Sequence, residues 1–215
     1  MILNTKCTSK LQIEGQEIKK VEKFCYLGSM ITKDGGADED IACRIQKARQ
    51  AFGSLKRVWA STRLSRRLKL QIFNSNIKSV LLYGCETWKV TRQTASRIQV
   101  FVNRCLRQIV RIYWPNVITN EDLHKLTGQR KMSDDIGLRK WGWIGHTLRK
   151  PQNDISRHAM SWNPQGTRRP GCPKTTWRRT VIKEAKGSGK CWNEVVALAQ
   201  NRTRWRCYVD ALRFT

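Results

Sequence analysis

The chain has 215 residues, 40% of them hydrophobic and 27% charged, a composition that supports folding with a polar surface. It carries 42 Lys and Arg against 16 Asp and Glu, a net charge of +26, so a polyanionic partner is expected. Nucleic acid is the first candidate and an anionic membrane surface the second. The nine Trp exclude a disordered basic tail for most of the chain, and no apolar run approaches membrane-spanning length.

The eight cysteines are scattered and form no Cys-x-x-Cys pair, and residues 1–11 lack a signal-peptide hydrophobic region. We therefore expect an intracellular protein, nuclear or cytoplasmic, with reduced thiols that pack as small hydrophobes. A zinc site would need Cys172, Cys191 and Cys207 to converge with a histidine, and their spacing fits no compact zinc template. No metal and no cofactor is expected.

Residues 1–36 are expected to form short strands. Leu11 and Ile13 alternate with polar residues before a Glu14-Gly15 turn, and an aromatic-rich strand is predicted over Phe24–Leu27. Two or three such strands are not stable alone in water. They need a larger sheet or a helix to cover them, so this segment is expected to be the end of a larger domain.

Residues 37–130 are expected to form a helical domain. Apolar residues recur at spacings of three and four over Asp38–Trp59, which predicts one amphipathic helix. Ser65 is placed to cap a second helix, and a third is expected over Thr94–Ile112, with Pro115 as its stop.

The rest of the chain divides into three parts by composition. Residues 131–152 predict a Trp-rich helix capped by Ser133, and residues 153–174 predict a linker rich in Pro, Gly and Arg. Residues 175–215 predict basic, small helices that begin at Trp177, Trp192 and Trp205. The predicted fold is mainly α: short N-terminal strands, a helical bundle and a basic region of small helices.

Two motifs invite an enzymatic interpretation, and neither is complete. Asp134-Asp135 resembles a two-metal carboxylate pair, but its polar flanks fit the first turn of a helix better. Gly187–Lys190 resembles the end of a phosphate-binding loop, yet Glu184 and Cys191 stand where that loop needs Gly and Ser or Thr.

Basic residues with few acids nearby are the candidate binding site. The third predicted helix carries four Arg at spacings of seven, three and four, which brings them close to one side. A second cluster lies in residues 168–179, and Arg-rich extended segments typically follow phosphates or enter grooves. The candidate nucleic-acid-binding residues are Arg97, Arg104, Arg107, Arg111, Arg149, Arg168, Arg169, Lys174, Arg178 and Arg179.

Several short strings, in order, resemble the C-terminal part of the endonuclease–reverse transcriptases of non-LTR (LINE-type) retrotransposons. They are Phe24–Ser29 (FCYLGS), Arg44-Ile45 with Ala48-Arg49, Leu81–Trp88 (LLYGCETW), Trp143–His146 with Leu148-Arg149, Pro173–Arg179 (PKTTWRR) and Trp205-Arg206. The resemblance implies that Tyr26, Leu27 and Gly28 belong to a primer-grip-like strand pair at the end of the polymerase palm. The following helices would be the thumb, and the basic remainder would bind element RNA or target DNA.

The same resemblance implies that this chain lacks the family's metal-binding carboxylates, which would lie upstream, and has no catalytic residues of its own. Two other interpretations remain open. A stand-alone RNA- or DNA-binding protein, independent of any element, would show the same charge and helices. A hydrolase built on His146 and a cysteine would need the thiol within hydrogen-bond reach of the imidazole. A membrane partner is disfavoured, because the Trp are spaced for cores rather than for one amphipathic face.

Overall fold

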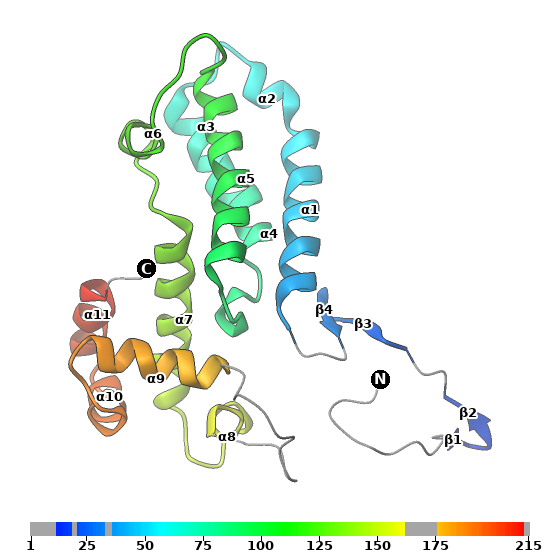
Figure 1. The fold of residues 1–215 in the computed structure, drawn as a ribbon, viewed down its shortest axis with the longest axis vertical. Coiled ribbons are helices and arrows are strands. Elements are labelled where there is room, and N and C mark those ends of the chain that lie inside the picture. Colours follow the sequence, from blue (N-terminus) through cyan, green and yellow to red (C-terminus); the bar gives the residue numbers. More distant parts are fainter. Residues whose placement is uncertain (1–11, 19–20, 33–35, 162–175, 213–215) are drawn as a thin grey trace. The chain divides into compact units, whose positions relative to one another are not determined.

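The computed structural model describes residues 12–18, 21–32, 36–161 and 176–212, and it is mainly α-helical, as predicted (Figure 1). The chain divides into two compact units. Unit 1 spans residues 1–84 and 90–129, and unit 2 spans residues 85–89 and 130–215.

The N-terminal strands form two separate antiparallel hairpins, so the described residues contain no larger sheet. They are β1 (Gln12–Ile13) with β2 (Gln16–Glu17), and β3 (Lys23–Tyr26) with β4 (Ser29–Thr32). Tyr26 pairs with Ser29, which leaves a two-residue turn at Leu27-Gly28 with φ of 48° and 80°. Two positive φ values mark a type I′ turn, which matches the twist of a tight hairpin and favours glycine.

The helices of unit 1 are α1 (Asp38–Ser54), α2 (Lys56–Ala60), α3 (Arg66–Ile72), the π-helix η1 (Phe73–Lys78), α4 (Ser79–Leu81), α5 (Arg92–Val110) and α6 (Asn120–Thr127). Their apolar stripes bury a shared core that includes Ile41, Ile45, Phe52, Phe73, Ile77, Ile98 and Leu106. The predicted Ser65 cap of α3 is confirmed, because the Ser65 side chain accepts a hydrogen bond from the Leu68 N–H, and Thr119 caps α6 in the same way.

Two predicted helix boundaries in unit 1 are wrong. The single helix expected over Asp38–Trp59 breaks at Leu55, where the Trp59 indole donates to the Phe52 carbonyl at 2.8 Å and stacks on the Phe52 ring. The indole thereby takes a carbonyl that a continuous helix would use. Helix α5 ends at Val110, just before the predicted end at Ile112, because Arg111 adopts the left-handed conformation, φ 60°, that closes a helix C-terminus.

The helices of unit 2 are the short 3₁₀ helix η2 (Cys85–Thr87), α7 (Met132–Leu148), α8 (Ile155–Ser161), α9 (Trp177–Gly187), α10 (Trp192–Ala199) and α11 (Arg202–Ala211). Helices α7, α9, α10 and α11 contribute to one core that contains Trp141, Ile144, Leu148, Val181, Val195, Trp205 and Tyr208. The Trp-rich helix and the basic C-terminal helices, which the sequence treats separately, therefore form one folded unit.

Three local predictions for unit 2 are corrected. Helix α7 begins at Met132 with Lys131 as its N-cap, so Ser133 lies inside the first turn and caps nothing. Helix α8 forms within the predicted linker, because the Asp154 carboxylate accepts from the Ser156 N–H and starts the turn. Helix α11 begins at Arg202, three residues before Trp205. The remaining linker, residues 162–174, lies outside the described residues.

A carboxylate and a glycine set the packing of α7. Glu184 of α9 accepts from the Lys140 ammonium at 2.5 Å and from the Trp141 indole at 2.7 Å, so one side chain satisfies two groups. Gly145 lies directly against Trp205, since a Cβ built there would be 2.0 Å from the indole nitrogen. The Trp205 indole in turn donates to the Trp141 carbonyl at 3.2 Å. Only glycine permits this approach of α11 to α7.

We predict that Gly145→Ala lowers the stability of unit 2 by about 1–3 kcal/mol, because the added methyl must displace the Trp205 ring. Gly142→Ala is the matched control: nothing lies within 4 Å of the Cβ it would add, and alanine favours the helix by about 1 kcal/mol. Urea unfolding followed by tryptophan fluorescence measures both. Equal effects of the two substitutions would contradict the close packing of Gly145 on Trp205.

Candidate nucleic-acid interface

Helix α5 presents a line of arginines. Successive residues of an α-helix are about 100° apart, so the spacings of Arg97, Arg104, Arg107 and Arg111 place them on one side. Arg97 and Arg104 are exposed, as is Val100 between them. We call these four arginines the α5 arginine row.

Arg107 also holds the loop that follows α5. Its guanidinium donates to the Asn120 side chain at 2.8 Å and to the Ile118 carbonyl at 3.3 Å. The buried Asn103 donates to the same Asn120 oxygen at 3.0 Å and lies 2.9 Å from the His124 imidazole nitrogen. This network fixes the α5–α6 loop, so Arg107 is only partly available to a ligand.

Arg111 joins the end of α5 to the α2–α3 segment. Its guanidinium donates to the Ala60 carbonyl. The buried Lys69 ammonium donates to two carbonyls of the same segment, Trp59 at 2.8 Å and Ser61 at 2.6 Å. Burial, together with the nearby Arg111, lowers the pKa of the Lys69 ammonium. The hydrogen bonds that Lys69 and Arg111 donate to these carbonyls therefore hold the backbone of the α2–α3 segment in place.

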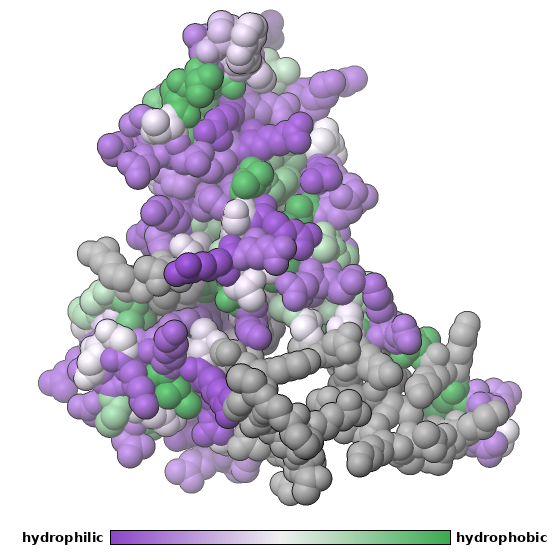
Figure 2. Space-filling view, viewed as in Figure 1, coloured by the Kyte–Doolittle hydropathy of each residue, from purple (hydrophilic) through white to green (hydrophobic). Residues whose placement is uncertain are grey.

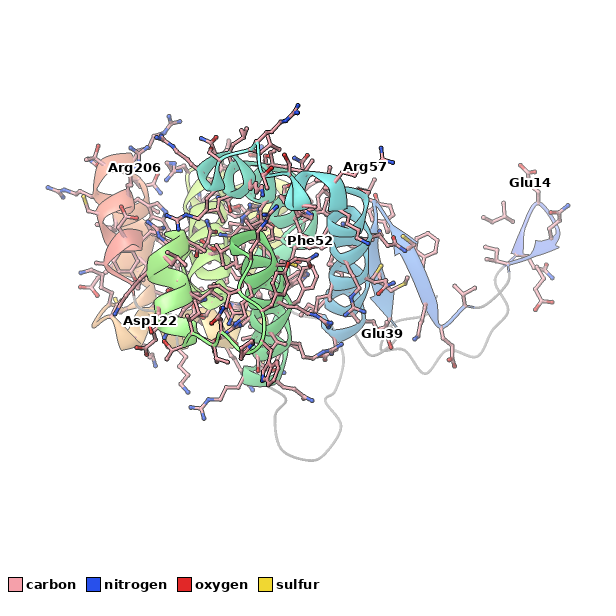
Figure 3. The ribbon with its side chains drawn as sticks, turned by 90° about the horizontal axis from the view of Figure 1, so that it is seen from above. Glu14, Glu39, Phe52, Arg57, Asp122 and Arg206 are labelled. Carbon is pink, nitrogen blue, oxygen red and sulfur yellow. The ribbon has the colours of Figure 1, made fainter. Side chains whose placement is uncertain are left out.

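The α2–α3 segment adds a cluster of exposed cations that the sequence reasoning missed. With Arg111 they form what we call the basic end: Lys56, Arg57, Arg63, Arg66, Arg67 and Arg111. Figure 3 shows Arg57 pointing outward, whereas Phe52 lies between the helices. The sequence did contain a signal for this cluster, because residues 41–85 hold ten Lys and Arg and no Asp or Glu.

The positive surface continues from α5 onto α1 and α3. Arg104 of α5 and Arg49 of α1 both lie close enough to the Cys105 thiol to oppose the effect of burial on its pKa.

Between α3 and α6 lies a groove of about 470 Å³, with Arg66 and Arg67 on one wall and Gly128 and Gln129 on the other. Hydrophilic side chains cover most of the visible face of these helices (Figure 2).

The predicted primer-grip-like residues lie at the tip of the β3–β4 hairpin. Tyr26 and Leu27 are exposed, while the Gly28 carbonyl accepts from Arg44 at 2.8 Å and from Lys47 at 3.2 Å. The Arg44 guanidinium is buried and lies 4.3 Å from the centre of the Tyr83 ring. The Asp40 carboxylate of α1 also accepts from the Met30 N–H at 2.9 Å, so side chains of both charges dock the hairpin on α1, and its tip faces solvent.

The predicted residues of unit 2 have mixed surroundings. Arg149 donates to the Ala199 carbonyl at 3.0 Å and Arg178 to the Ser161 carbonyl at 3.0 Å, so both hold backbone turns. Arg179 is exposed. The other three predicted residues, Arg168, Arg169 and Lys174, lie outside the described residues.

The buried cysteines are poor nucleophiles. Burial raises the pKa of the Cys85 thiol and of the Cys105 thiol to about 12 each, whereas an activated thiol needs a lowered pKa. Asp134 and Asp135 lie in the first turn of α7, where carboxylates favour the helix dipole. No group of three or more His, Cys, Asp or Glu among the described residues is arranged to hold a metal ion.

We predict that a thiol reagent at pH 8 labels Cys25, Cys191 and Cys207 quickly in the native protein, because these side chains are exposed. Cys85 and Cys105 should label only as fast as the chain unfolds, since their thiolates form near pH 12. Mass spectrometry of timed samples separates the two groups. Rapid native labelling of Cys85 or Cys105 would contradict their burial.

Comparison with known proteins gives two similarities. The profile of a domain of unknown function, DUF6451, matches residues 51–83, which run from the end of α1 through the basic α2–α3 segment to α4. An uncharacterized transposon-derived protein of Caenorhabditis elegans is 22% identical over 197 residues, which cover 88% of this chain and 70% of that protein. No solved structure matches the chain. Among the described residues, no helix combines the length and the apolar character needed to cross a membrane.

Proposed function

We propose that unit 1 binds the phosphate backbone of RNA or DNA through the α5 arginine row and the basic end. The observation that carries this proposal is the convergence of two cation-rich segments, joined by the contact of Arg111 with the Ala60 carbonyl. From residue 41 to residue 120 the sequence contains sixteen Lys and Arg and a single acid, Glu86. Few carboxylates are therefore available to neutralise this surface, and phosphates would do so with release of counterions.

The spacing of the α5 arginine row suits a nucleic-acid backbone. Arg97 and Arg111 are fourteen residues apart, about 21 Å along a helix. One strand of a duplex carries a phosphate about every 3.4 Å of its axis, so the row spans roughly six phosphates. Contacts of this kind position a backbone and carry no sequence information, so little sequence preference is expected.

We further infer that the chain derives from a transposable element and corresponds to the thumb and C-terminal region of a non-LTR reverse transcriptase. Similarity to a transposon-derived protein supports the origin, and the ordered strings from FCYLGS to PKTTWRR support the particular kind of element. On this proposal the chain binds nucleic acid without catalysing a reaction. The purified protein should therefore extend no primer.

We predict that Arg97→Gln with Arg104→Gln weakens binding to an unstructured RNA about tenfold, roughly 0.7 kcal/mol per exposed cation. Glutamine keeps a similar helix propensity, so α5 should remain folded. The slope of log K against log salt should fall in magnitude by about 1.4, since each lost contact removes about 0.7 on single strands. Fluorescence anisotropy across a salt series measures both quantities.

Arg202→Gln with Arg206→Gln removes the same charge from exposed positions on α11 and serves as the control. It should change affinity less than threefold if binding is localised on unit 1. Equal losses from both pairs would show a response to net charge alone. An affinity that barely changes with salt would contradict the phosphate-contact proposal itself.

A further inference from the structure

Trp114 is the most exposed large hydrophobic side chain among the described residues. Its exposed fraction is 89%, and that of the adjacent Tyr113 is 58%. By contrast, Trp59, Trp141 and Trp205 are each at most 4% exposed. An indole left in water forgoes the stabilisation that burial gives the other tryptophans, so this position has no explanation in the packing of unit 1.

The backbone that carries Trp114 is held on both sides. The Asn116 N–H donates to the Tyr113 carbonyl at 2.9 Å, which closes a turn around Trp114. The Ile112 N–H donates to the Arg107 carbonyl at 2.9 Å, and the Arg107 guanidinium holds the Ile118 carbonyl beyond the turn. The fold therefore fixes the segment on both sides of the turn while leaving the two aromatic rings uncovered.

The charge around the turn favours a phosphate-bearing ligand. Arg111, which belongs to the basic end, precedes Trp114 by three residues. Its hydrogen bond to the Ala60 carbonyl connects the turn at Trp114 with the α2–α3 segment. The nearest acids in the sequence are Glu121 and Asp122 in the first turn of α6, and Asp122 is engaged by the Thr119 hydroxyl at 2.7 Å. A strand approaching from the basic end would meet cations first and the aromatic turn next.

We propose that Trp114, with Tyr113, stacks on an unpaired base of a single-stranded nucleic acid whose phosphates lie on Arg111 and the basic end. This inference rests on the proposed function and specifies its ligand as single-stranded. Bases in a duplex are already stacked on each other, so an exposed ring gains little from them, whereas an unpaired base offers a free face. Neighbouring arginines and exposed aromatic rings are the combination that single-strand binders use.

The test compares Trp114→Ala, Trp114→Phe and the control Val117→Ala, which trims another exposed apolar side chain of the same loop. The ligands are an unstructured RNA 12-mer, the same strand in a blunt duplex, and the same strand with abasic positions. Trp114→Ala should weaken 12-mer binding about tenfold or more, because one stacked base contributes on that scale. Duplex binding should change less than twofold, Trp114→Phe should retain most of the affinity, and Val117→Ala should match the wild type.

The abasic strand separates stacking from structural damage. The wild type should bind it as weakly as Trp114→Ala binds the intact 12-mer, and Trp114→Ala should not distinguish the two strands. An unchanged 12-mer affinity for Trp114→Ala, or an equal loss on single strand and duplex, would overturn the stacking inference while leaving the proposed function intact. A wild-type protein that binds none of the three ligands would overturn the proposed function.

Discussion

The folded chain contains many cations and few carboxylates. Many of these cations donate their hydrogen bonds to backbone carbonyl oxygens instead. Arg44 donates to Gly28, and Lys69 donates to Trp59 and Ser61. The same arrangement recurs in pairs of an arginine and a carbonyl: Arg107 with Ile118, Arg111 with Ala60, Arg149 with Ala199 and Arg178 with Ser161. A carbonyl carries only a partial charge, so these contacts meet the hydrogen-bonding needs of the cations without removing the net positive charge.

This constraint divides the basic residues into two groups with different tasks. Cations that bind carbonyls fix the turns between helices: Arg44 holds the β3–β4 hairpin, and Lys69 holds the α2–α3 segment. Exposed cations such as Arg97, Arg104 and Arg57 lie on the elements that the first group holds. Carboxylates serve some cations in both units: Glu39 accepts from Lys23 at 2.9 Å in unit 1, and Glu184 serves both Lys140 and Trp141 in unit 2. The uncompensated charge of unit 1 is what a polyanion would neutralise.

Local patterns in the sequence predicted much of the fold. Apolar spacings located the main helices, and the Ser65 cap was predicted because capping depends on a few adjacent residues. The break at Leu55 was not predictable, since it depends on where the Trp59 indole finds a carbonyl. The α5 arginine row followed from helical periodicity. The basic end required the distant contact of Arg111 with Ala60, although the acid-free stretch of residues 41–85 marked one of its two parts.

Photocrosslinking tests the central claim most directly, because it shows where a bound strand lies without changing the protein. A short RNA with photoreactive bases would be bound at low salt, irradiated and digested with the protein for mass spectrometry. The account predicts that crosslinked peptides come chiefly from the α2–α3 segment and from the end of α5 through Trp114. Crosslinks confined to residues 130–215 would contradict it.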